Sequence, residues 1–170
     1  MCLNKKNIEI WNWDKKPRTL LRYIKVGDIV CYEMDKTGDF FGYGQLIADM
    51  KWGFALKIFK ITHINPNDIT LEDILDSKKL GRIFIIDAYA TFDRKYTKNG
   101  EWRIIGREKN FKLEQTDIDN TYFVMGIKGM LQKINLLGES QNISDKEQDN
   151  NNYIWLSPLS GDLVKEYILD

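Results

Sequence analysis

The chain has 170 residues, 43% apolar and 12% aromatic, and is too rich in core-forming side chains to be disordered. Its 25 Lys and Arg residues balance 25 Asp and Glu residues, which argues against a general binder of polyanions; any nucleic-acid role would need a local basic patch. We expect one β-rich domain, residues 1–170, with an N-terminal arm over residues 1–24.

Three further features bear on where the protein works. No apolar run approaches the ~18 residues that a membrane-spanning helix requires. The first residues lack the apolar region of a secretory signal peptide. The two cysteines, Cys2 and Cys31, do not make a disulfide framework. Together these features predict a cytoplasmic protein that has no contact with a membrane.

The first clear elements are two antiparallel strands, over residues 25–34 and 40–47. Residues 35–39 supply the turn between them, with a glycine available for positive φ. Gly42 and Gly44 lie inside the second strand, where glycine usually marks a bulge or a close approach of another segment. We expect this hairpin to open a β-rich core.

A further strand and a short acidic helix follow. Residues 52–62 alternate as a strand, but the apolar parity changes at Phe59, which predicts a bulge or two covered faces. Thr70 is a good N-cap, and Asp73 three residues later completes a variant of the capping box. The acidic residues of this segment are partly explained by the helix dipole, because acids favour a helix N-terminus. An acidic docking surface is the functional alternative.

Residues 82–92 carry a strong strand pattern and predict a central strand covered on both faces. We expect Asp87 in this run to be a structural hydrogen-bond acceptor rather than a catalytic acid. Asn99 and Gly100 predict a hairpin turn into a strand over residues 101–106. The basic residues of this hairpin, among them Arg103 and Arg107, are expected to form cross-strand ion pairs.

The C-terminal third predicts less regular structure. Residues 122–127 predict a strand, and residues 131–137 form a short segment of ambiguous structure. Residues 139–152 contain almost no apolar side chain and predict a mobile polar loop. Residues 158–170 predict a C-terminal helix that docks on the sheet. The expected class is α+β, mainly β, with a strongly bent antiparallel sheet or a small barrel.

A search for catalytic patterns finds little. His63 is the only histidine, so a site with several histidine ligands is excluded, and two distant cysteines do not form a zinc site. Phosphate-binding glycine loops and a nucleophile elbow are both lacking. We therefore predict no catalytic residues, no metal and no cofactor. A site that uses Cys31 with His63 remains an alternative.

Three short segments carry a resemblance to a known family: Gly-Asp-Ile-Val at 27–30, Phe-Gly-Tyr-Gly-Gln-Leu at 41–46 and Trp-Arg-Ile-Ile-Gly at 102–106. They resemble the bacterial polymorphic-toxin immunity proteins of the "immunity protein 26" type, over about residues 22–107. The resemblance implies a cytoplasmic protein that binds and neutralises a toxin encoded beside it. It supplies no catalytic residues.

The leading hypothesis is a non-enzymatic inhibitor that blocks a cognate toxin domain by stoichiometric association, with its oligomeric state left open. If the toxin is a nuclease, an acidic patch would match its basic substrate groove. The candidate toxin-binding residues are Asp68, Glu72, Asp73 and Asp76, a second group of Glu114, Asp117 and Asp119, and Tyr43.

The alternative hypothesis is a nucleic-acid-binding β-barrel module. It would use Trp11, Trp13 and Trp102 together with the basic residues around them, because aromatic rings between cations can stack bases and hold phosphates.

Overall fold

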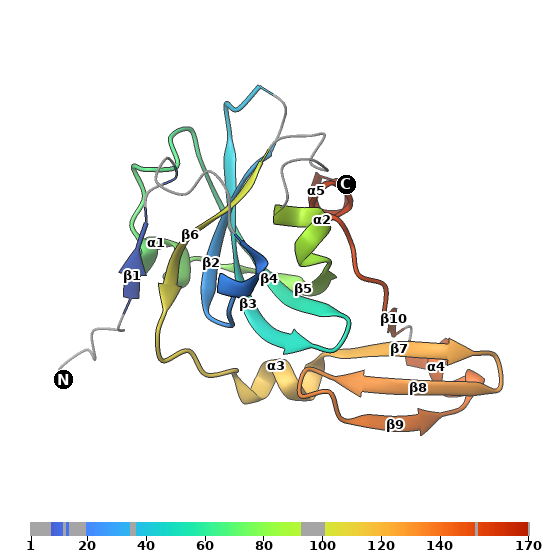
Figure 1. Cartoon of the computed structure of the whole chain (residues 1–170). Coiled ribbons are helices and arrows are strands. Elements are labelled where there is room, and N and C mark those ends of the chain that lie inside the picture. The colour runs from blue at the N-terminus through green and yellow to red at the C-terminus, as the bar shows by residue number, and fades with distance from the viewer. Residues whose placement is uncertain are drawn as a thin grey trace.

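The computed structural model describes residues 8–11, 13, 20–34, 37–92, 101–151 and 153–169, which form two β-sheets with short helices around them (Figure 1). The larger sheet has six strands in the order β1-β6-β2-β3-β4-β5. Their bounds are β1 (Ile8–Ile10), β2 (Asp28–Glu33), β3 (Phe41–Met50), β4 (Gly53–His63), β5 (Lys79–Ile86) and β6 (Trp102–Glu108).

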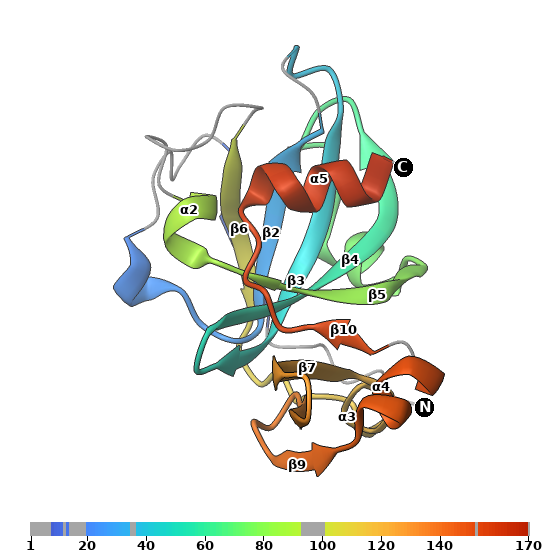
Figure 2. The same ribbon diagram turned by 90° about the vertical axis from the view of Figure 1, so that its right-hand side faces the viewer.

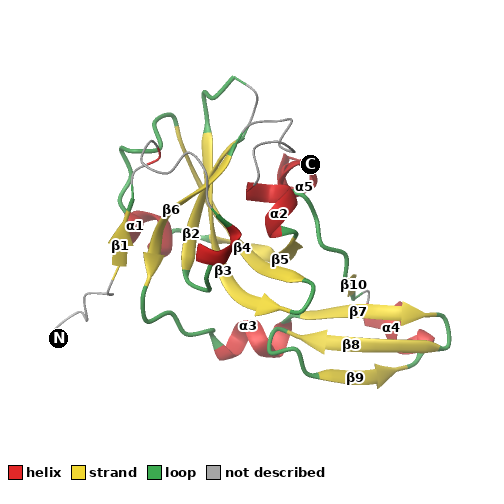
Figure 3. Cartoon of the chain, in the orientation of Figure 1, coloured by secondary structure: helices red, strands yellow, loops and turns green. Residues whose placement is uncertain are grey.

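The smaller sheet has four strands in the order β10-β7-β8-β9. Its strands are β7 (Tyr122–Ile127), β8 (Met130–Asn135), β9 (Ser140–Ile143) and β10 (Ile154–Trp155). The helices, coloured red in Figure 3, are η2 (Leu21–Tyr23), α1 (Leu71–Asp76), α2 (Ala88–Phe92), α3 (Gln115–Asn120), α4 (Asp145–Asn151) and α5 (Gly161–Leu169). The pairing of β10 with β7 is parallel, so this sheet is mixed.

The α+β, mainly β class is confirmed. Every pairing in the larger sheet is antiparallel. The small-barrel alternative is wrong, because β1 and β5 stay at opposite edges and do not pair within the described part of the chain. Register shifts in the β3–β4 and β4–β5 ladders mark bulges, and these strands curve across the molecule (Figure 2). The parity change at Phe59 falls at one of them.

The β2–β3 hairpin is confirmed, and its glycines lie where other groups come close. A Cβ on Gly42 would lie 2.4 Å from the ring of Tyr32, and one on Gly44 would lie 2.9 Å from the carbonyl oxygen of Lys57. The β3–β4 register also shifts directly after Gly42. Both expected reasons for glycine in a strand, a bulge and a close approach, therefore apply here.

The prediction of a central strand over residues 82–92 is wrong in two respects. The strand β5 ends at Ile86 and is the last strand of the larger sheet. Residues 88–92 form the helix α2, because Asp87 accepts hydrogen bonds from the backbone N–H groups of Tyr89 and Ala90 at 2.8 and 3.1 Å. The role expected for Asp87, a structural acceptor, is confirmed.

The predicted hairpin at Asn99 and Gly100 is also wrong as a pairing. Strand β6 pairs with β2 and β1, not with β5. The turn residues themselves lie outside the described residues. The connection from β5 to β6 therefore runs from the β5 edge of the larger sheet to its opposite side, where β6 lies between β1 and β2.

The range 139–152 is not a loop throughout. It contains β9 and α4, which the low apolar content did not predict. Polar contacts hold them: Lys133 forms an ion pair of 2.9 Å with Glu147, and the Gln148 side chain donates to the carbonyl oxygen of Tyr153. The C-terminal helix is confirmed as α5, which lies across the larger sheet and buries Val164 completely (Figure 2).

Three apolar clusters form the core. One lies between the larger sheet and α5, with Val30, Leu46 and Phe84 among its members. The second lies on the opposite face and includes Cys31 together with residues of α1. The third joins the curved end of the larger sheet to the smaller sheet. The two sheets therefore share buried apolar surface.

Candidate protein-interaction site

Helix α1 presents the acidic patch, which we define as Asp68, Glu72, Asp73 and Asp76. The helix forms because Thr70 accepts a hydrogen bond from the backbone N–H of Asp73 at 3.1 Å while the Asp73 carboxylate accepts from the N–H of Thr70, a complete capping box. Burial of Ile74 against the second core cluster turns the acidic side chains outward. All four carboxylates are exposed.

Three members of the acidic patch border a shallow hollow of about 410 Å³, with Ile61, His63, Ile69 and Ser77 as the other lining residues. Within the part of the chain that the structure describes, no ion pair joins the acidic patch to a cation. The carboxylate of Asp73 is occupied by the capping box, whereas Asp68, Glu72 and Asp76 point their charges to solvent. The patch is thus a concentration of uncompensated negative charge.

The second predicted acidic group, Glu114, Asp117 and Asp119, differs from the acidic patch because two of its carboxylates are paired with lysines. Lys57, only 6% exposed, contacts Asp117 at 2.5 Å and Glu114 at 3.6 Å. Lys79 contacts Glu114 at 2.8 Å, and this hydrogen bond holds the pKa of the Glu114 carboxyl below its usual value. These groups neutralise one another between β4, β5 and the start of α3. Asp119 is exposed and accepts a hydrogen bond from Gln115.

Tyr43 is also excluded from the surface. Its side chain is completely buried in the second core cluster, so a partner cannot reach it without opening the core. Cys31, its neighbour across the β2–β3 ladder, is equally buried, and this burial raises the pKa of the thiol. A reactive cysteine needs the opposite shift and access to substrate. The alternative of an enzyme that uses Cys31 therefore lacks a usable nucleophile.

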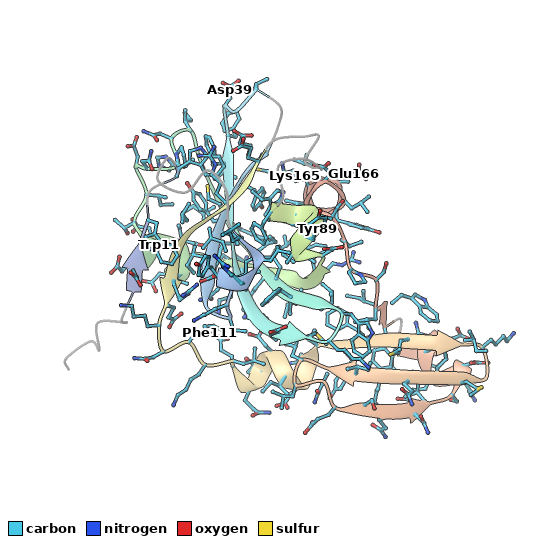
Figure 4. The ribbon with its side chains drawn as sticks, in the orientation of Figure 1. Trp11, Asp39, Tyr89, Phe111, Lys165 and Glu166 are labelled. Carbon is cyan, nitrogen blue, oxygen red and sulfur yellow. The ribbon has the colours of Figure 1, made fainter. Side chains whose placement is uncertain are left out.

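The aromatic residues of the nucleic-acid alternative are engaged in packing. Trp102 is 4% exposed and stacks on Tyr32 with ring centroids 4.2 Å apart. Trp13 is 7% exposed and lies beneath the guanidinium of Arg103. Trp11, labelled in Figure 4 beside β1, is partly buried under the guanidinium of Arg107. Buried rings cannot stack bases, so Trp13 and Trp102 are not available for a stacking surface.

Analysis of the sequence missed an aromatic groove between the two sheets. We define the groove as a hollow of about 470 Å³ bordered by β5, β10 and α5. Among the aromatic residues that line it, Trp155 and Tyr167 are exposed, at 52% and 50%, and Arg82 stacks over the Tyr167 ring. The two segments that line it, β5 and residues 153–167, are separated by about half of the chain, so the sequence does not show that they meet. The only signal in the sequence is the aromatic residues of the C-terminal segment.

The fold defines an α+β protein that is mainly β. The functional candidates are open patches, and the described residues include no group of three or more His, Cys, Asp or Glu side chains that could hold a metal ion. Likewise, no helix in the described ranges is long and apolar enough to cross a membrane.

Comparison with known proteins identifies the family. The family model of immunity protein 26 matches residues 25–131, more than half of the chain, and the chain belongs to this family. Immunity proteins of this kind are typically non-enzymatic, in agreement with the prediction from the sequence. Neither the comparison with curated proteins nor that with solved structures gave a match.

Proposed function

We propose that this protein is a cytoplasmic immunity protein that neutralises one cognate bacterial toxin by forming a stoichiometric complex with it. Membership of the immunity protein 26 family carries the proposal, because family membership implies a toxin partner. The exposed, uncompensated charge of the acidic patch supports it further, since such charge is suited to a partner of opposite sign.

In this proposal the acidic patch contacts a basic face of the toxin. Uncompensated carboxylates accelerate the encounter with a basic partner, and this effect weakens as salt screens the charges. A nuclease is the toxin class that best fits such a patch, because its substrate groove binds phosphates. The hollow beside Asp68 and Asp76 would then receive a cationic side chain of the toxin.

The test measures association of the purified chain with the toxin domain encoded beside its gene. A triple variant, Asp68→Lys, Glu72→Lys and Asp76→Lys, spares Asp73 because that residue caps α1. We expect association at low salt to slow by roughly tenfold or more. The variant should stay folded, with only a small loss of thermal stability because Glu72 lies in the first turn of α1. The control triple variant, Asp39→Lys, Asp49→Lys and Asp119→Lys, changes exposed carboxylates elsewhere by the same net charge; Figure 4 shows Asp39 at the far end of the β2–β3 hairpin.

Two outcomes would contradict the proposal at different levels. If the wild-type chain binds no toxin and gives no protection from it, the proposed function is wrong. If the acidic-patch variant and the control variant associate at the same rate, the chain remains an inhibitor but the acidic patch is not its contact.

A further inference from the structure

The groove lies between the free edges of two sheets. Strand β5 ends the order of the six-stranded sheet, and β10 ends that of the four-stranded sheet. Figure 2 shows the two strands next to each other beneath α5, and both contribute lining residues to the same hollow. No ladder joins them in the described chain, because β5 pairs with β4 and β10 pairs with β7.

Backbone groups on both sides point into this space. The carbonyl oxygen of Ile85 accepts from Leu159, and the N–H of Asp87 donates to Leu159, so these residues of the β5 edge face away from β4. The β4–β5 ladder is regular from Ile83 to Ile86, so alternation along the strand gives Ile83 the same outward direction as Ile85. On the other side the N–H of Leu156 donates to Val124 of β7, so Trp155 directs its backbone groups away from β7.

The chain itself shows that the β5 edge accepts an added strand. Leu159 forms a parallel bridge with Ile86, with hydrogen bonds of 2.8 and 2.9 Å to its neighbours. This pairing covers only the end of β5. The edge around Gly81 and Ile83 continues past it without a strand partner in the described residues. Another extended polypeptide fits this place because it supplies the same backbone donors and acceptors.

The side chains of the groove indicate what that polypeptide carries. The guanidinium of Arg82 lies 4.6 Å from the Tyr167 ring centroid and 5.2 Å from that of Phe84. The groove lining includes no carboxylate, and Arg82 forms no ion pair with a described residue. The half-exposed Trp155 and Tyr167 offer apolar contact area, and Trp, Tyr and Arg are the residues that most often dominate binding energy.

We propose that the groove binds an extended segment of the cognate toxin, which adds as a strand to the edge of β5. A carboxylate of the segment pairs with Arg82, and a large apolar side chain packs against Trp155 and Tyr167. This inference rests on the proposed function and adds a second contact to it. Helix α1 lies on one side of the larger sheet, and α5 and β10, which border the groove, lie on the other (Figure 1). The segment therefore has to project from the part of the toxin that contacts the acidic patch. The acidic patch accelerates association, whereas the groove slows dissociation.

The test compares matched pairs of substitutions in the complex with the toxin domain encoded beside the gene. The groove variant is Arg82→Glu with Tyr167→Ala. The control variant is Arg22→Glu with Tyr23→Ala, because Arg22 stacks over the exposed Tyr23 as Arg82 stacks over Tyr167. We expect dissociation of the groove variant to be at least about tenfold faster than that of wild type, with the association rate and the control variant unchanged.

Hydrogen exchange of the wild-type complex gives a second readout that does not depend on any variant. The backbone amide of Ile83 should exchange more slowly when the toxin is bound. If the toxin binds but this amide stays unprotected and the groove variant dissociates like wild type, the inference is wrong and the proposed function stands. If wild type binds no toxin, both are wrong.

A second copy of the chain is the competing occupant. Light scattering of the chain alone distinguishes it: a dimer that Arg82→Glu converts to a monomer would overturn the inference of a toxin segment. A monomer at the concentrations of the binding experiment agrees with it.

Discussion

The guanidinium of Arg107 forms an ion pair with Asp28, whose side chain has no exposed surface. The two residues face each other across the β2–β6 ladder. Asp28 also accepts a hydrogen bond from the backbone N–H of Lys25 at 2.8 Å, and Arg107 donates to the carbonyl oxygen of Tyr23. The pair therefore joins the entry of β2 to the end of β6, two segments that are about 80 residues apart.

Replacing Asp28 with Ala should destabilise the fold by about 3–5 kcal/mol, because the partly buried Arg107 would lose its counter-charge. The measurement is the free energy of unfolding from urea denaturation. The control is Glu9→Ala, since Glu9 and Lys109 form an exposed pair of 3.5 Å that should contribute at most about 1 kcal/mol. Equal effects of the two substitutions would contradict the structural role of Asp28.

Gly42→Ala should cost about 1–3 kcal/mol of stability by overpacking. The added Cβ would lie 2.4 Å from the Tyr32 ring, which cannot move away because it stacks on Trp102. Gly81→Ala is the control, because a Cβ there meets open space, and a change within about 0.5 kcal/mol is expected. Thermal unfolding of both variants tests this prediction, and a neutral Gly42→Ala would contradict the packing of Tyr32.

Glu114 should make the stability depend on pH in the acid range. The hydrogen bond from Lys79, together with the charge of Lys57, lowers the pKa of Glu114 from its usual 4.5 in the folded chain. A lowered folded-state pKa gives stabilisation that is present above the unfolded pKa and is lost as the pH falls through the folded value. Wild type should therefore lose more stability than Glu114→Gln between about pH 5 and pH 3. Parallel stability curves for the two proteins over this range would contradict it.

Local signals identified several elements from the sequence. The β2–β3 hairpin, the capping box of α1 and the apolar face of α5 each depend on residues that are close in the chain. The end of β5 was missed because residues 88–92 fit a strand pattern as well as a helix, and the cap by Asp87 decided between them. The strand β9 and the helix α4 were missed because their stability comes from polar contacts with β8 and with Tyr153.

The two acidic groups differ in the same respect: local sequence is enough to identify one, and contacts with distant residues decide the other. Asp68, Glu72, Asp73 and Asp76 were identified as an acidic group and are exposed, since one short helix and the loop before it carry all four acids. Glu114 and Asp117 have the same sequence character, yet Lys57 and Lys79 neutralise them from strands about 35 to 60 residues away. A chain of neutral net charge does not reveal which of its carboxylates are paired.

By itself the sequence determined the β-rich class, the family, the hairpin at Gly42 and the helices of residues 71–76 and 161–169, because strand and turn patterns, caps and apolar periodicity act over a few residues. Only the tertiary structure decided that β5 is an edge strand, that a second sheet forms and that Tyr43 is buried. It also brought Arg82, Trp155 and Tyr167 together at one groove. These features depend on pairing and burial between distant segments, where long-range packing selects one arrangement among several that the local patterns allow.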